Sequence, residues 1–182
     1  QNGHADVVAA LLAAGADPNS ANESNGTFPL LLASQNGHAD VVAALLAAGA
    51  DPNSANESNG TFPLLLASQN GHADVVAALL AAGADPNKFD EKDGGLFPLL
   101  AAAGLGHDQV VSLLIFKGAD VQRIWLNTGL NSLEVCLVMF DEQDDPQDKH
   151  ACWRGAKALL KGRATKQDGT IPELPPEPPQ AA

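Results

Sequence analysis

The first half of the chain lacks cationic side chains. Residues 1–87 contain no Lys or Arg, and all ten basic residues come from Lys88 onward. The same stretch carries eight acids: Asp6, Asp17, Glu23, Asp40, Asp51, Glu57, Asp74 and Asp85. Proteins bind nucleic acid mainly by neutralising phosphates with cationic side chains, so nucleic acid and anionic membrane surfaces are poor partners for this half. A protein partner with a basic or neutral polar face fits the charge better.

Long apolar runs and cysteine frameworks are also missing. Each apolar run stops after a few residues at Gly, Asp or Pro, so no membrane insertion is predicted. The only two cysteines, Cys136 and Cys152, show neither disulfide-framework nor zinc-knuckle spacing. A reducing compartment is therefore expected, which favours a cytoplasmic (intracellular) location.

The sequence repeats itself letter for letter. Residues 1–34, QNGHADVVAALLAAGADPNSANESNGTFPLLLAS, return at 35–68, and half of the unit returns from Gln69. Within a unit, TFPLLLAS predicts a short helix with proline in its first turn. ADVVAALLAAG predicts a second helix that Gly49 ends, with one apolar stripe formed by Val41, Val42, Leu45 and Leu46. Neither helix is long enough to be stable alone, so neighbouring copies must bury these stripes.

The consensus of the unit indicates a family. A period near 34 also occurs in tetratricopeptide repeats, but their pattern requires tyrosine, and this chain has none. The pattern G-x-x-P-L-x-L-A-x-x-x-G-H-x-x-V-V-x-x-L-L-x-x-G-A-D-x-N instead resembles the ankyrin repeat. The resemblance covers about residues 1–164. It implies an all-α ankyrin-repeat solenoid with short β-hairpin-like loops.

The repeat boundaries predict the domain organisation. We expect an ankyrin repeat domain over 1–164, with a partial first repeat, full repeats from about residues 24, 58 and 92, and a degenerate C-terminal cap repeat at about 127–164. The tail 165–182 is rich in proline and should be extended; an SH3-like ligand is a weaker alternative to a simple terminus. Upstream of Gln1 we expect another TFPLLLAS-like half repeat, because without it the apolar edge of the first helix pair is bare.

Two departures from the family pattern carry predictions. The family's Thr-Pro-Leu-His is replaced by FPLL, so we expect Phe28, Phe62 and Phe97 to pack against the neighbouring repeat in place of a polar network. Alanines replace charged residues on the outer face of the second helix. Helix propensity explains them, and a covering partner chain is the alternative.

The sequence gives little support for a catalytic or metal-binding site. Equivalent histidines in stacked repeats should lie about 8–10 Å apart, too far to share a metal. The resemblance to ankyrin repeats implies that His4, His38, His72 and His107 each bond to the backbone of their own turn. The acidic loop from Asp141 to Asp148 lacks the ligand order of a calcium site, and Pro146 disfavours its geometry. His150 and Cys152, one residue apart, do not make a nucleophile and base pair. We predict no enzyme activity, no cofactor and no metal.

The resemblance leaves two functions open. One is a non-enzymatic scaffold that binds a partner protein through the concave ankyrin surface. The other is an architectural spacer in which the repeats only set length and stiffness. The oligomeric state is not predicted. For the scaffold, the family's contact positions map to Ser24, Asn25, Thr27, Gln35, Asn36, Ser58, Asn59, Thr61, Gln69, Asn70, Asp93, Leu96 and Leu105. We place the centre at Leu96 and Leu105 as exposed apolar anchors, although they could also merely cover the start of the cap.

Overall fold

The computed structural model describes residues 4–92, 94–142, 154–159, 170 and 173–178. The chain divides into two compact units, unit 1 (Gln1–Asp85) and unit 2 (Pro86–Ala182). Unit 1 holds α1 (Ala5–Ala13), α2 (Pro29–Gln35), α3 (Ala39–Ala47), α4 (Pro63–Gln69) and α5 (Ala73–Ala81). Unit 2 holds α6 (Pro98–Gly104), α7 (Asp108–Phe116) and α8 (Ser132–Glu142), and residues 154–159 are also helical. The described part is therefore all-α, as predicted.

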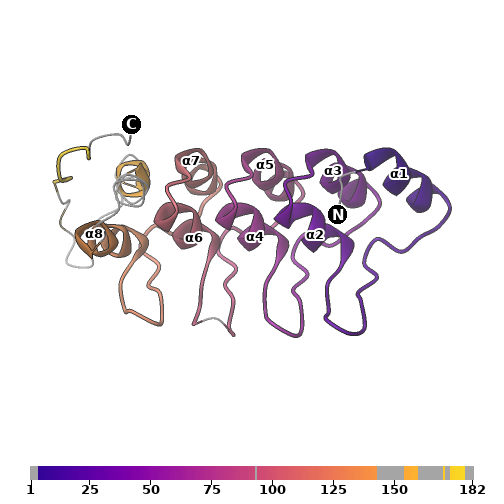
Figure 1. The fold of residues 1–182 in the computed structure, drawn as a ribbon, viewed down its shortest axis with the longest axis horizontal. Coiled ribbons are helices and arrows are strands. Elements are labelled where there is room, and N and C mark those ends of the chain that lie inside the picture. The colour runs from indigo at the N-terminus through magenta and orange to yellow at the C-terminus, as the bar shows by residue number, and fades with distance from the viewer. Residues whose placement is uncertain (1–3, 93, 143–153, 160–169, 171–172, 179–182) are drawn as a thin grey trace. The chain divides into compact units, whose positions relative to one another are not determined.

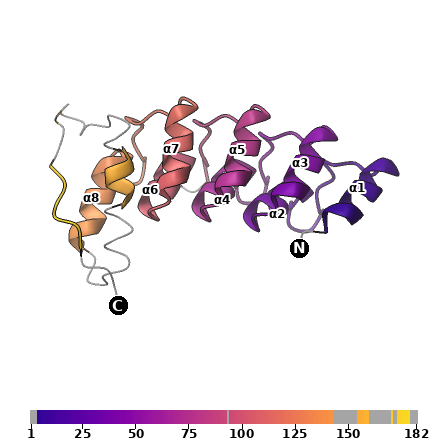
Figure 2. The same ribbon diagram turned by 90° about the horizontal axis from the view of Figure 1, so that it is seen from above.

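Unit 1 stacks its helices in two rows. α1, α3 and α5 follow one another in one row, α2 and α4 form the other, and the loops project beyond α2 and α4 (Figure 1). Figure 2 shows the succession of α1, α3 and α5 from above. α2 packs against both α3 and α4, and α3 packs against both α1 and α5. α3 and α5 thus bury their apolar stripes against neighbouring helices, as short helices require.

Local sequence sets where these helices begin and end. Phe28 is the extended N-cap of α2, and Pro29 follows in the first turn, where its missing N–H is not needed. α3 ends at Ala47, and Gly49, just beyond the C-cap Ala48, has a φ of 90°, which only glycine adopts without strain. The N–H of Gly49 donates to the carbonyl of Leu46 at 3.1 Å, and the N–H of Ala50 donates to that of Leu45 at 2.9 Å. These two bonds make a Schellman motif and satisfy carbonyls at the end of the helix.

The three phenylalanines that replace threonine are core residues. Phe28, Phe62 and Phe97 are only 7%, 1% and 1% exposed. In unit 2 the guanidinium of Arg123, in the loop that follows α7, lies 5.7 Å from the centroid of the Phe97 ring. Burial of all three rings is confirmed; their packing against the neighbouring repeat stays a prediction.

Identical helices differ in exposure along unit 1. The helices α1, α3 and α5 share the sequence ADVVAALLA, yet Val7 is 52% exposed while the matching Val41 and Val75 are 7% and 1% exposed. Leu11 is 56% exposed, against 1% for Leu45 and 0% for Leu79. Because the sequence is the same, the difference comes from the neighbours alone. α1 presents an apolar stripe that α3 and α5 bury.

Unit 2 packs α6 against both α7 and α8. A reciprocal capping box begins α8. The Oδ1 of Asn131 accepts from the N–H groups of Leu133 and Glu134, both at 3.1 Å, and the Oε2 of Glu134 accepts from the N–H of Asn131 at 3.0 Å. This helix and residues 154–159 lie where the cap repeat was predicted.

Several sequence predictions fall outside the described residues. They concern the acidic loop beyond Glu142, the pair His150 and Cys152, and the boundary at residue 164. In the tail, residues 173–178 form neither helix nor strand. Among the residues described, β structure is limited to two isolated bridges, Asp90 with Leu96 and Ile124 with Asn131, which close hairpin-like loops. No helix in this part is both long and apolar enough to cross a bilayer.

Candidate partner-binding surface

The predicted contact residues of unit 1 differ in how exposed their side chains are. Those at the loop tips and at the ends of α2 and α4 are exposed, whereas Thr27 and Thr61 are half-buried. We call the exposed set the loop–helix face: Ser24, Asn25, Gln35, Asn36, Ser58, Asn59, Gln69 and Asn70. Asp93 lies outside the described residues. The structure therefore exposes one polar face that occurs twice in unit 1.

Many polar groups of this face also hold their own loop. The Oδ1 of Asn25 accepts from the N–H of Thr27 at 3.0 Å and from its hydroxyl at 2.7 Å. Asn59 and Thr61 repeat the arrangement at 3.1 and 2.7 Å. These side-chain turns fix the backbone of the tip before any partner arrives. A ligand would meet a preorganised loop, which lowers the entropy cost of binding.

The amides at the helix ends are likewise engaged. The Nδ2 of Asn36 donates to the carbonyl of Leu32 at 2.7 Å, and that of Asn70 donates to Leu66 at 2.8 Å. Each bond satisfies a carbonyl of the last helical turn, which would otherwise need water. Gln35 and Gln69, one residue earlier, have longer side chains that extend from the exposed ends of α2 and α4. Both glutamines are exposed, so both stay predicted contact residues.

Sequence reasoning missed an asparagine that links the repeats. In unit 1 the Nδ2 of Asn53 donates to the carbonyl of Gly83 at 3.0 Å, and its Oδ1 accepts from the N–H of Asp85 at 2.8 Å. Asn19 makes the same two bonds to Gly49 and Asp51, at 3.2 and 3.0 Å. Within unit 2, Asn87 repeats them with Gly118 and Asp120. The signal was the final Asn of every ADPN, since a side-chain amide offers one donor and one acceptor at this reach.

A second amide ties neighbouring loop tips together. Asn56 is 2% exposed; its Oδ1 accepts from the N–H of Ser58 at 2.8 Å, and its Nδ2 donates to the carbonyl of Asn25 at 3.0 Å. The matching Asn22 in the preceding copy is exposed. The buried amide therefore depends on having a preceding loop to bond. The sequence alone cannot show this, because the two asparagines sit in identical segments.

The recurring histidine has a structural bond, but not the one expected. The Nε2 of His72 lies 3.1 Å from the carbonyl oxygen of Gln35, at the end of the preceding copy's α2, instead of bonding its own turn. A Cβ on Gly37 would come within 2.7 Å of the Nδ1 of the same ring. His72 thus joins two copies and packs on a glycine backbone. Among the described residues, no three or more His, Cys, Asp or Glu side chains are grouped to hold a metal.

The two predicted apolar anchors are not equivalent. Leu105 is 46% exposed, but Leu96 is half-buried. They also flank opposite ends of α6, and a seven-residue helix is about 10 Å long. The two leucines therefore cannot form one compact anchor, and only Leu105 is exposed as expected.

Unit 2 exposes further apolar side chains that the sequence reasoning overlooked. Phe116 is 82% exposed, Leu126 73% and Ile124 45%. Leu126 also packs on the adjacent loop, because a Cβ on Gly95 would meet its side chain at 3.1 Å. For Ile124 and Leu126 the available signal was IWLN, which places apolar residues where the unit 1 loops carry Ala, Asn and Glu.

The charge on unit 1 is entirely at its surface. All eight acids of residues 1–87 that the sequence provides are exposed, and no Lys or Arg in this stretch can neutralise them. Unit 2 differs, because it holds the half-buried Arg123. Its guanidinium lies 4.3 Å from the centroid of the Phe89 ring and its Nη1 donates to the carbonyl of Asn87 at 3.1 Å. That cation is occupied in holding loops together.

Comparison with known families agrees with the helix-pair repeats. A family model described as ankyrin repeats (3 copies) matches residues 1–90, and a single ankyrin repeat model matches residues 94–124. Together they cover about two thirds of the chain, which therefore belongs to the ankyrin repeat family. No curated protein gave a match. Ankyrin repeats are generally protein-interaction modules without catalytic activity, so protein binding is the general role of this chain's family.

Proposed function

We propose that this chain is a non-enzymatic scaffold that binds one partner protein through the loop–helix face. The partner presents a basic or neutral polar surface. Binding at two identical copies of the face, one around α2 and one around α4, lets a partner with two suitable sites engage both at once. Such linked engagement raises the overall affinity without any new kind of contact.

The observation that carries the proposal is the charge of unit 1. Its eight acids are exposed and no cationic side chain of that stretch stands among them. Negative charges clustered at this density attract a basic partner over a distance of about 8 Å at physiological salt. A surface of this kind also repels nucleic acid and anionic lipid, which leaves protein as the macromolecule that fits.

The spacer function has its own supporting observation. The paired bonds of Asn19 and Asn53, with the Asn56 bond between loops, stiffen the links between copies in unit 1. Stiffness is what a spacer needs, and it is also what a scaffold needs in order to hold two sites at a fixed separation. The two functions therefore differ in whether the loop–helix face itself contacts a partner.

Site-specific photo-crosslinking distinguishes them. A photoreactive amino acid is placed at Gln35 on the loop–helix face, and in a matched variant at Ala47, which is exposed on the outer face of α3. The scaffold function predicts that the Gln35 variant crosslinks one discrete protein and that the Ala47 variant does not. Equal yields at both positions, or no crosslinked product at Gln35, would exclude the loop–helix face as the binding surface.

A further inference from the structure

The two copies of the loop–helix face in unit 1 are held by the same internal bonds. At the tips, Asn25 and Asn59 each accept two bonds, from Thr27 and Thr61 respectively. At the ends of α2 and α4 the same asparagine amide donates to a carbonyl of the last turn in both copies. The two copies therefore present the same donors and acceptors in the same local geometry.

Two contacts fix the register between these copies. At the loop tips the Nδ2 of Asn56 donates to the carbonyl of Asn25 at 3.0 Å. At the helix ends the Nε2 of His72 lies 3.1 Å from the carbonyl oxygen of Gln35. The helices themselves are in contact, since α2 packs against α4. Packed helices lie about 8–10 Å apart, so the second copy of the face follows the first at about that spacing.

This spacing distinguishes between the extended conformations of a peptide ligand. Polyproline II rises about 3.1 Å per residue with three residues per turn, so every third side chain points the same way about 9.3 Å further along. Three residues of a β-strand span a similar length, but successive side chains alternate between the two faces, so the third residue points away. Of these two forms, polyproline II is the one that places equivalent side chains on both copies of the face.

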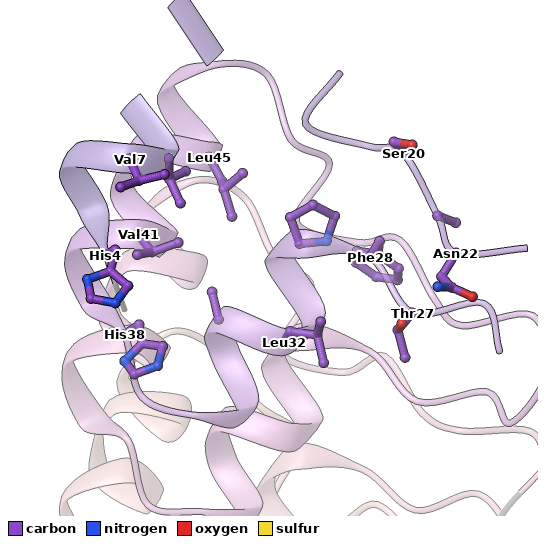
Figure 3. A pocket seen from close by; sticks show the side chains of 14 residues that line it. His4, Val7, Ser20, Asn22, Thr27, Phe28, Leu32, His38, Val41 and Leu45 are labelled. Carbon is purple, nitrogen blue, oxygen red and sulfur yellow. The ribbon is translucent and has the colours of Figure 1, made fainter. Parts of the chain in front are cut away.

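An α-helix reaches a similar spacing with seven residues, which rise about 10.5 Å. Helical ligands lay an apolar stripe in an apolar groove. In unit 1 a groove of about 590 Å³ beside α1 has apolar side chains in its lining, including Val7, Val41 and Leu45, but none of the residues of the loop–helix face lines it (Figure 3). That face consists of Ser, Asn and Gln side chains. Polyproline II suits it better, because its backbone has no internal hydrogen bonds and can bond to side-chain amides.

Each copy also has one exposed carboxylate at its loop tip. Glu23 and Glu57 directly precede Ser24 and Ser58 in the sequence, and both glutamates are exposed. Residues 1–87 contain no Lys or Arg that could neutralise them. A polyproline II ligand with one cation per turn would therefore meet one carboxylate per copy.

We propose that the partner binds the loop–helix face as a polyproline II segment with a basic residue at every third position. Two successive basic residues lie one against each copy, near Glu23 and Glu57, and the ligand backbone bonds to the polar side chains of the face. This inference rests on the proposed scaffold function and adds to it the conformation and the charge period of the partner.

Fluorescence anisotropy with two labelled peptides of the same length, composition and charge tests the period. The periodic peptide is PPKPPKPPKPP. The control, PKPPPKPPPKP, spaces its lysines by four residues, so that they point in different directions along the polyproline II helix. We expect saturable binding of the periodic peptide to the whole chain, about fivefold or more tighter than the control and weaker as salt is raised. Equal binding of the two peptides, or tighter binding of the control, would refute the three-residue period.

Charge-neutralising variants of the chain locate the site. Glu23→Gln combined with Glu57→Gln should weaken binding of the periodic peptide about fivefold, because two exposed ion pairs are lost. The matched control, Asp40→Asn combined with Asp74→Asn, removes the same charge from the first turns of α3 and α5. It should change the affinity less than about twofold. Equal losses in the two variants would mean that net charge alone attracts the peptide, and the site would be wrong.

Crosslinking at Gln35 separates this inference from the function on which it rests. If a discrete protein is captured there while the chain shows no preference for the periodic peptide, the scaffold function stands and the polyproline II ligand is excluded. If no protein is captured at Gln35, the scaffold function fails and this inference fails with it. A captured protein that lacks any segment with a basic residue at every third position would likewise contradict the proposed ligand.

Discussion

At the scale of single residues, side-chain amides decide how firmly the copies of unit 1 are joined. Asn53 makes one bond as donor and one as acceptor to the backbone of the next copy. Asn53→Ala removes both and leaves a backbone carbonyl and N–H without their partner. We expect the free energy of unfolding, measured by urea denaturation, to fall by about 2 kcal/mol.

The control for this change is Asn59→Ala, since Asn59 bonds only within its own exposed loop in the bonds described. It should cost about 0.5–1 kcal/mol. If the two variants lose the same stability, the inter-repeat bonds of Asn53 contribute nothing beyond ordinary loop order.

Alanine substitutions at two glycines distinguish the energetic cost of backbone strain from that of steric crowding. Gly37 and Gly49 both have positive φ, 72° and 90°. A Cβ at Gly37 would meet the His72 ring at 2.7 Å, whereas a Cβ at Gly49 would have nothing within 4 Å. Gly49→Ala should therefore cost about 1 kcal/mol from strain alone, and Gly37→Ala about 2–3 kcal/mol. Thermal or urea unfolding measures the difference, and equal losses would show that the ring moves aside freely.

At the scale of elements, the three second helices of unit 1 have the same sequence, so any difference in their stability must come from their neighbours. α1 has no buried residue, whereas α3 buries Val41, Val42 and Leu45. Burial and neighbouring helices determine how often a helix opens locally. Amide hydrogen exchange followed by NMR should therefore show faster exchange in α1 than in α3 and α5. Uniform exchange would mean that the sequence, and not the neighbour, sets helix stability here.

Leu105 is the element-scale test of the apolar anchor. It is the C-cap residue of α6 and is 46% exposed, so it is not part of the packed interior. Leu105→Asp should weaken binding of the crosslinked partner by about 1–2 kcal/mol and shift the thermal midpoint little. Full affinity for the partner, or a large fall in the midpoint, would remove Leu105 from the binding surface.

At the scale of the whole molecule, the sequence predicts the architecture because short segments contain all the necessary signals. These are the repeat period, the residues that begin and end each helix, and the apolar stripe. The predicted helices, the capping role of Gly49 and the burial of Phe62 follow from those signals. The exposure of Val7 against that of Val41 does not, since the two lie in identical segments and differ only in what covers them. For the same reason the bond of Asn56 emerges only when neighbouring loops are placed in space.

The most direct measurement of the central claim is the affinity of the crosslinked partner for two charge-matched variants. One carries Gln35→Arg and Gln69→Arg on the loop–helix face; the other carries Ala47→Arg and Ala81→Arg on exposed positions of the second helices. Both add the same charge, so a change in net attraction affects them equally. Isothermal titration should show affinity reduced about tenfold or more for the glutamine variant and within about threefold of the unsubstituted chain for the alanine variant. Equal affinities for the two variants, or a greater loss for the alanine variant, would contradict the account.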